Sequence, residues 1–193
     1  EVFIPAYRDE ILSDTVMVYG NVDEVELVLN GKTIRRQTAD KGPDSDYIPV
    51  PNGGNGKNLH FPPFTFYGVP KERGVLKAVG YHQGKKVAEY TVKTPGVPER
   101  LDITYFESGK PATKNDLLIV YVRMLDKQGV LCPVNGIPVE LSVQGGEIVG
   151  PTSYPLEAGV ASFLVRTGEI SKININATGK GFSTRKSLKV GKE

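Results

Sequence analysis

The side chains best suited to acid–base chemistry are the neighbouring carboxylates of Glu24 and Glu26. Hydrolysis of a sugar bond needs two carboxylates about 5 to 10 Å apart that face one cleft. Around these two glutamates, apolar and polar residues alternate with the period of a strand, which predicts that both carboxylates point to solvent from one strand. With a two-residue turn at Asn30 and Gly31, Glu26 is predicted to face Arg35 as an exposed cross-strand ion pair. A structural role is therefore favoured over a catalytic one.

Three aspartates, Asp40, Asp44 and Asp46, could offer oxygen ligands to calcium. Their spacing does not match the calcium loop of an EF-hand, which needs ligands at positions 1, 3 and 5 and a glycine at position 6. A solvated acidic loop is favoured, and no metal-binding residue is predicted.

The remaining reactive groups are two histidines and one cysteine. Neither His60 nor His82 has a nucleophile near it in the sequence, and both are predicted to lie at the surface or in loops. Cys132 has no neighbouring base that would lower the pKa of its thiol, so we expect a half-buried free thiol. No catalytic residue, cofactor-binding residue or cofactor is predicted.

A polar, glycine-rich segment at 38–60 is longer than an ordinary connection between strands. Loops of this kind are often functional or mobile. Exposed aromatic rings can stack on the apolar face of a sugar, and the chain has 9 Tyr and 7 Phe but no Trp. Phe64 and Phe66 share a strand face and are predicted to lie in the core. Tyr47, His60 and Phe61 are the candidate ligand contacts.

The elements that position these residues are predicted to be short strands. The chain has 22 Gly and 14 Pro among 193 residues, and no helical periodicity persists over three turns. The segment 93–99 carries two prolines and a glycine, which cannot continue a central strand. We therefore predict an all-β chain of two tandem immunoglobulin-like antiparallel β-sandwiches, at 1–96 and 97–193. The predicted strands are 15–19, 24–29, 32–37, 64–67, 75–81 and 85–92, then 100–105, 117–125, 137–143, 160–165, 173–177 and 185–190.

Composition narrows the function classes. A formal net charge of +2 gives no reason to expect a nucleic-acid partner. No apolar run is long enough to insert into a membrane. A single cysteine allows no intrachain disulfide. The chain has no basic leader followed by an apolar run and does not begin with Met, so we expect a processed chain or an excised fragment.

Blocks of sequence in both halves resemble the C-terminal immunoglobulin-like accessory domains of glycoside hydrolase family 2, the β-galactosidase-like enzymes. The second half also resembles, more loosely, the immunoglobulin-like repeats of invasin-type adhesins. The first half carries the resemblance at 16–21, 23–27, 29–32, 62–66, 74–81, 84–88 and 92–96, and the second at 100–101, 115–117, 120–122, 126–129, 138–139, 157–161 and 177.

The resemblance implies a non-catalytic C-terminal fragment of an exported bacterial glycoside hydrolase that scaffolds or extends the catalytic barrel in polysaccharide degradation. The family's two catalytic glutamates belong to an upstream barrel that nothing here matches. The implied partners are the catalytic domain of the same parent chain and a polysaccharide, in the periplasm, outside the cell or at its surface. Two alternatives stay open. A carbohydrate-binding module predicts exposed aromatics in a row, and an invasin-like adhesion repeat predicts a stack of near-identical repeats.

Overall fold

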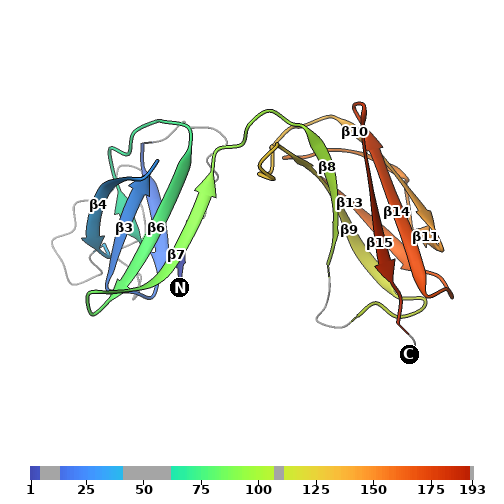
Figure 1. Ribbon diagram of the computed structural model, residues 1–193, viewed down its shortest axis with the longest axis horizontal. Coiled ribbons are helices and arrows are strands. Elements are labelled where there is room, and N and C mark those ends of the chain that lie inside the picture. Colours follow the sequence, from blue (N-terminus) through green and yellow to red (C-terminus); the bar gives the residue numbers. More distant parts are fainter. Residues whose placement is uncertain (5–13, 41–61, 107–110, 192–193) are drawn as a thin grey trace. The chain divides into compact units, whose positions relative to one another are not determined.

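A computed structural model describes residues 1–4, 14–40, 62–106 and 111–191 (Figure 1). The described residues form strands and turns in four antiparallel sheets, which confirms the predicted all-β, immunoglobulin-like class. Among them there is no helix with the length and apolar character to cross a membrane.

Contacts between backbone positions divide the chain into two compact units, Glu1–Thr94 and Pro95–Glu193. The division falls inside the predicted linker at 93–99, two residues before the predicted boundary. Independent folding of the two units stays a prediction, and each unit is described here by itself.

The described residues of the first unit form two sheets that enclose one apolar core. The smaller has the order β1-β2-β5, and the larger has the order β4-β3-β6-β7. Alternate residues of β3, among them Val25 and Leu27, are fully buried, as are Phe64 and Phe66 of β5, so the predicted core role of these two rings is confirmed. The strands are β1 (Val2–Phe3), β2 (Val16–Gly20), β3 (Glu24–Leu29), β4 (Lys32–Thr38), β5 (Phe64–Phe66), β6 (Val75–His82) and β7 (Lys85–Lys93).

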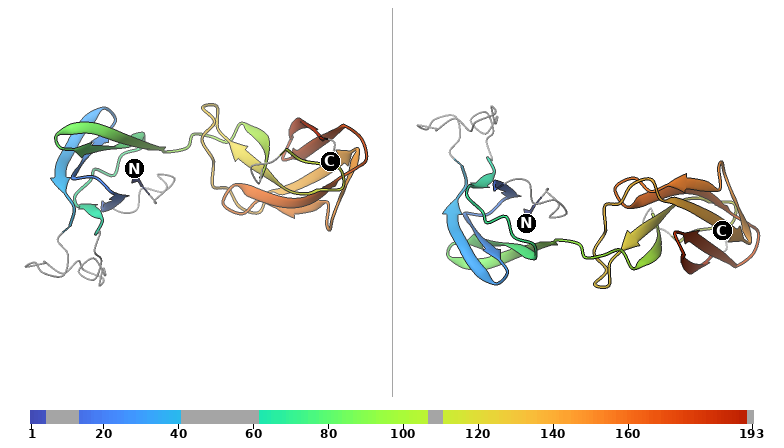
Figure 2. Two further views of the ribbon diagram at one scale, coloured as in Figure 1. Left: turned by 90° about the horizontal axis from the view of Figure 1, so that it is seen from below. Right: turned by 90° about the horizontal axis from the view of Figure 1, so that it is seen from above.

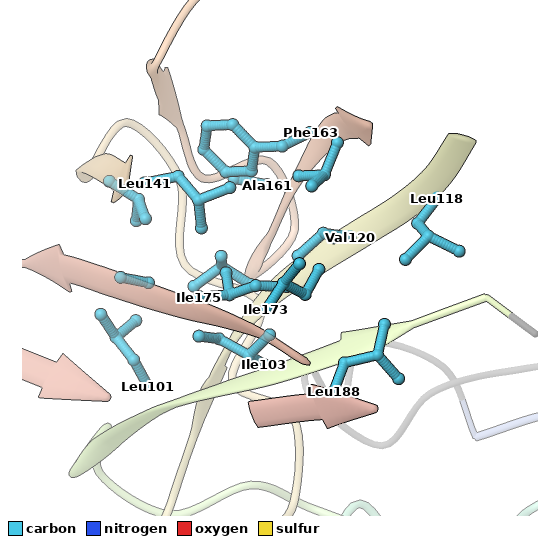
Figure 3. Close-up of a cluster of buried hydrophobic side chains, with 14 of the residues drawn as sticks. Leu101, Ile103, Leu118, Val120, Leu141, Ala161, Phe163, Ile173, Ile175 and Leu188 are labelled. Atoms are coloured by element: carbon cyan, nitrogen blue, oxygen red, sulfur yellow. The ribbon is translucent and has the colours of Figure 1, made fainter. Parts of the chain in front are cut away.

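The second unit also has two sheets, with the orders β11-β13-β9-β8 and β12-β10-β14-β15. Figure 2 shows its strands from two further directions. Side chains from six strands point toward one another between the sheets, among them Ile103, Val120, Phe163 and Ile175 (Figure 3). The strands are β8 (Arg100–Tyr105), β9 (Leu117–Leu125), β10 (Pro138–Gln144), β11 (Gly146–Ile148), β12 (Ser153–Pro155), β13 (Val160–Thr167), β14 (Lys172–Gly179) and β15 (Phe182–Lys189).

The predicted turn at Asn30 and Gly31 has positive φ at both residues, 51° and 80°. These are the angles that a type I′ hairpin turn requires. The register beyond this turn differs from the prediction. A two-residue turn predicts Leu27 opposite Ile34 and Glu26 opposite Arg35.

The structure instead pairs Leu27 with Arg35 and Glu26 with Arg36, after a register shift between Leu27 and Val28. A β-bulge leaves one extra residue in a strand, here Ile34. Ile34 is half-buried and packs against the core, and the shift gives Glu26 a new set of neighbours.

Candidate functional site

The three candidate ligand contacts, Tyr47, His60 and Phe61, lie outside the described residues, and so do Asp44 and Asp46 of the candidate calcium ligands.

The third aspartate, Asp40, has a structural role. Its carboxylate accepts hydrogen bonds from the backbone N–H of Thr65, at 3.0 Å, and from the Thr65 hydroxyl. These bonds fix the start of the long loop to β5. Within the part of the chain that the structure describes, there is no group of three His, Cys, Asp or Glu residues that could hold a metal ion.

Glu26, the strongest candidate for chemistry, is held by two hydroxyl donors on the outer side of β3. The Thr33 hydroxyl donates to Oε1 at 2.7 Å, and the Tyr81 hydroxyl donates to Oε2 at 2.7 Å. The Arg36 guanidinium lies over the Tyr81 ring, 3.7 Å from its centroid, and pairs with Glu24 at 2.6 Å. The predicted partner of Glu26, Arg35, is therefore wrong, because the bulge brings Arg36 to this position.

Hydrogen bonds in this network shift the pKa values of Glu26 and Tyr81 in opposite directions. The hydrogen bond from Thr33, followed by that from Tyr81, lowers the pKa of Glu26. The hydrogen bond to Glu26 in turn raises the pKa of Tyr81, which keeps the phenol protonated. A carboxyl that acts as a general acid near neutral pH needs a raised pKa. Glu26 has the opposite shift. Its hydrogen bonds therefore have a structural role, which is to link β3 to β4 and β6 on the outer face of the sheet.

We expect Glu26→Ala to lower the free energy of unfolding by less than about 1 kcal/mol, since its bonds are solvent-accessible. Gly31→Val is expected to cost about 1–3 kcal/mol, because a β-branched residue is strained at the φ of +80° found there. Denaturant melts of the two variants compare them directly. A larger loss of unfolding free energy for Glu26→Ala than for Gly31→Val would contradict this structural role and point to a buried or functional carboxylate.

The predicted surface position of His82 is confirmed. His82 Nδ1 lies 3.0 Å from Asp23 Oδ1, and both side chains are more than half exposed. The backbone N–H of Gln83, followed by His82, lowers the pKa of Asp23. These contacts link the turn between β6 and β7 to the residue just before β3.

Cys132 is a free thiol, but it is buried rather than half-buried as predicted. Burial, together with the nearby Asp126 carboxylate, raises the pKa of the thiol. A protonated, buried thiol is a poor nucleophile.

The structure brings together aromatic side chains that sequence reasoning missed. Phe3 and Tyr19 are directly opposite each other in the β1–β2 pair, and both side chains are exposed. Tyr90 of β7 meets Phe3 edge to face, with ring centroids 5.1 Å apart. Phe3, Ala88, Glu89 and Tyr90 also line a shallow hollow of about 460 Å³. β1 has only two residues, too few for an alternating pattern, so the sequence carried no signal for this aromatic row.

Three comparisons relate the chain to known proteins. A family model described as "Domain of unknown function (DUF4982)" matches residues 13–88. A β-galactosidase of Thermoanaerobacter pseudethanolicus is 30% identical over 176 residues, which cover 85% of this chain and 22% of that protein. A β-galactosidase of Rhizobium radiobacter is 30% identical over 129 residues, covering 66% of this chain and 92% of that sequence.

Solved structures agree with these matches. A glycosyl hydrolase family 2 member from Bacteroides cellulosilyticus superposes with a TM-score of 0.70 at 25% identity, over 95% of this chain and 25% of that one. The chain thus spans about a fifth to a quarter of the length of the Thermoanaerobacter and Bacteroides cellulosilyticus proteins. These similarities show that the chain belongs to the β-galactosidase-like family of glycoside hydrolases, family 2.

Proposed function

We propose that this chain is a non-catalytic accessory part of a longer, exported bacterial glycoside hydrolase, on the C-terminal side of the catalytic barrel. The observation that carries the proposal is that the chain spans only 22% of a β-galactosidase to which it is similar over 85% of its own length. A family 2 enzyme of that size has ample further chain to hold its catalytic residues.

The chemistry of the described residues supports the same proposal. Glycoside hydrolysis needs one carboxyl with a raised pKa and a second, ionised carboxylate across the scissile bond. Glu26 has a lowered pKa, and each of its carboxylate oxygens accepts a hydrogen bond from a neighbouring hydroxyl. Glu24 is paired with Arg36. Each unit is a β-sandwich with its own apolar core, so it can serve as a stable support for the catalytic domain of the same parent chain.

The purified chain is expected to show no turnover of aryl β-galactosides or aryl β-glucuronides. Its removal from the full-length parent is expected to lower the parent's melting temperature, because the surface that it covers becomes exposed to water. Glycosidase activity that co-purifies with the isolated chain contradicts the proposal, and so does an unchanged melting temperature of the shortened parent.

The aromatic row of Phe3, Tyr19 and Tyr90 favours one second function, a carbohydrate-binding module. The apolar face of a sugar ring fits an exposed aromatic ring, and the nearby hollow offers room for a ring beside Phe3. In native gels cast with a soluble polysaccharide, such a module is retarded, and Phe3→Ala abolishes the retardation while Val87→Ala, at an exposed β7 position, leaves it unchanged. Equal mobility with and without polysaccharide rules this function out for the polysaccharide used.

A further inference from the structure

An apolar row crosses the outer face of the sheet β11-β13-β9-β8 in the second unit. The backbone N–H of Phe106 donates to the Ile119 carbonyl, Ile119 pairs with Leu164, and the N–H of Val149 donates to the Leu164 carbonyl. These four residues therefore lie side by side, one from each strand of the sheet or from its immediate end. All four have the outward parity: Phe106 is 60% exposed, Ile119 43% and Val149 38%, and Leu164 between them is half-buried.

The preference of strands for apolar side chains does not explain why all four residues of the row are apolar. Phe106 follows the last residue of β8, and Val149 follows the last residue of β11. Contiguous exposed apolar side chains of this kind mark an interaction surface. A further exposed leucine, Leu117, lies next to Ile119 on the same face of β9 and widens the surface.

The charges around the apolar row are neutralised within the unit. Arg166 pairs with Glu147 beside Leu117, and Arg123 pairs with Asp102 toward the other end of β9. Both pairs join adjacent strands, so they are built into the sheet. The surface between them offers no net charge to an ionic ligand, and with one aromatic ring among four side chains it is poorly suited to stack sugars. An apolar centre with a polar rim is the anatomy of a protein–protein interface.

We infer that the apolar row is the docking surface of this chain for the remainder of its own parent polypeptide, the part that carries the catalytic domain. The inference rests on the proposed function. The β-galactosidase of Thermoanaerobacter pseudethanolicus has more than three-quarters of its chain outside the region matched here, and such a remainder is large enough to cover the apolar row. A docked domain of the same polypeptide is held at high effective concentration by the covalent link, so a small apolar contact suffices to hold it.

Side-chain footprinting with a diffusible carbene or radical label tests this on the full-length parent and on the isolated 193-residue chain. Labelling of Phe106 and Ile119 is expected to fall about threefold or more in the parent, because the centre of an interface is packed like a protein interior. Val87, an apolar residue that is 56% exposed on β7 of the first unit, is the matched reference within the same sample. Equal labelling of the apolar row in the two proteins overturns the inference.

A pair of variants in the parent sharpens the test. Ile119→Lys is expected to return Phe106 labelling to the level of the isolated chain and to leave the melting temperature of the isolated chain unchanged, since position 119 is exposed there. Val87→Lys is expected to change neither. Unchanged protection of Phe106 in the Ile119→Lys parent contradicts the inference.

A different occupant of the apolar row would give a different result in these experiments. Protection in the isolated chain that rises with concentration, together with the mass of a dimer in sedimentation, identifies a second copy and overturns the inference. If removing the chain destabilises the parent but the apolar row stays labelled, only the docking surface is wrong. If removal leaves the parent unchanged, the proposed scaffolding function itself fails.

Discussion

Asp126→Ala is expected to lower the free energy of unfolding of the second unit by about 3 kcal/mol, since each hydrogen bond to a charged group contributes about 1.5–3 kcal/mol. Asp126 is only 2% exposed. Its Oδ2 accepts the backbone N–H of Gly96 at 2.7 Å, and its Oδ1 accepts that of Val130 at 2.8 Å. The backbone N–H groups of Gln128 and Gly129 also help to lower the pKa of this carboxyl group. The alanine variant removes the carboxylate oxygens that accept the N–H groups of Gly96 and Val130.

The same contacts make the stability of this unit depend on pH. Burial acts to raise the pKa of Asp126, but the N–H groups of Gly96, Val130, Gln128 and Gly129 outweigh it and lower the pKa below the ordinary 3.8. A lowered pKa in the folded state means that the stabilisation is fully present above the ordinary pKa and is lost as pH falls through the lowered value. Urea melts between pH 7 and pH 2 measure it, and Asp126→Ala should flatten the acid side of the curve.

Asp126→Asn is the matched control. It keeps one oxygen acceptor and the side-chain volume, so its cost is expected to fall below that of alanine, without the acid dependence of the native chain. A loss of less than about 0.5 kcal/mol for Asp126→Ala, typical of a surface substitution, would show that the carboxylate does not hold Gly96 and the turn in solution.

Gly159→Ala is expected to have an effect at least as large, about 3 kcal/mol or more. Gly159 occupies the second position of a turn at φ +82°, where a Cβ is strained. A Cβ built there would also lie 2.1 Å from the carbonyl oxygen of Cys132. That oxygen is backbone, so the clash cannot be relieved by a side-chain rotation.

Gly181 supplies a matched comparison, because it holds the equivalent position in another two-residue turn at φ +80°. A Cβ at Gly181 meets nothing within 4 Å. Gly181→Ala is therefore expected to cost only the backbone strain, about 1–2 kcal/mol. Thermal melts of the two variants give the difference, and equal losses would show that the contact between Gly159 and Cys132 is not kept in solution.

Much of the strand content followed from sequence because period-two alternation survives wherever one face is buried. β3 was predicted at its observed limits, and so were β8 and β9. Among the described residues, the strands that were missed, β1, β11 and β12, have two or three residues each, too few to show a period. Their pairing depends on longer strands placed beside them by the rest of the fold.

In the candidate sites too, features set by local pattern were predicted and features set by contacts between distant residues were not. The outward-facing position of Glu26 was predicted from alternation, although the side chain is half-buried. Its partners were not predicted, because the bulge at Ile34 shifts the register by one residue. The burial of Cys132 and the contact between Phe3 and Tyr90 both depend on residues that are far apart in the chain, so local sequence did not predict them.

The all-β class and the turn at Asn30 and Gly31 could be predicted from the sequence, since these depend on local pattern and backbone preference. The family was indicated by blocks of similar sequence in both halves. Which outward side chains form a continuous surface became clear from the folded structure alone. Phe106, Ile119, Leu164 and Val149 lie in four separate segments of the sequence, and strand pairing places them in one row. Likewise, Gly159 and Gly181 have the same backbone conformation, and only the Cys132 carbonyl packed against Gly159 sets their tolerance to substitution apart. Register and close packing are set by contacts between distant segments, and local pattern does not encode them.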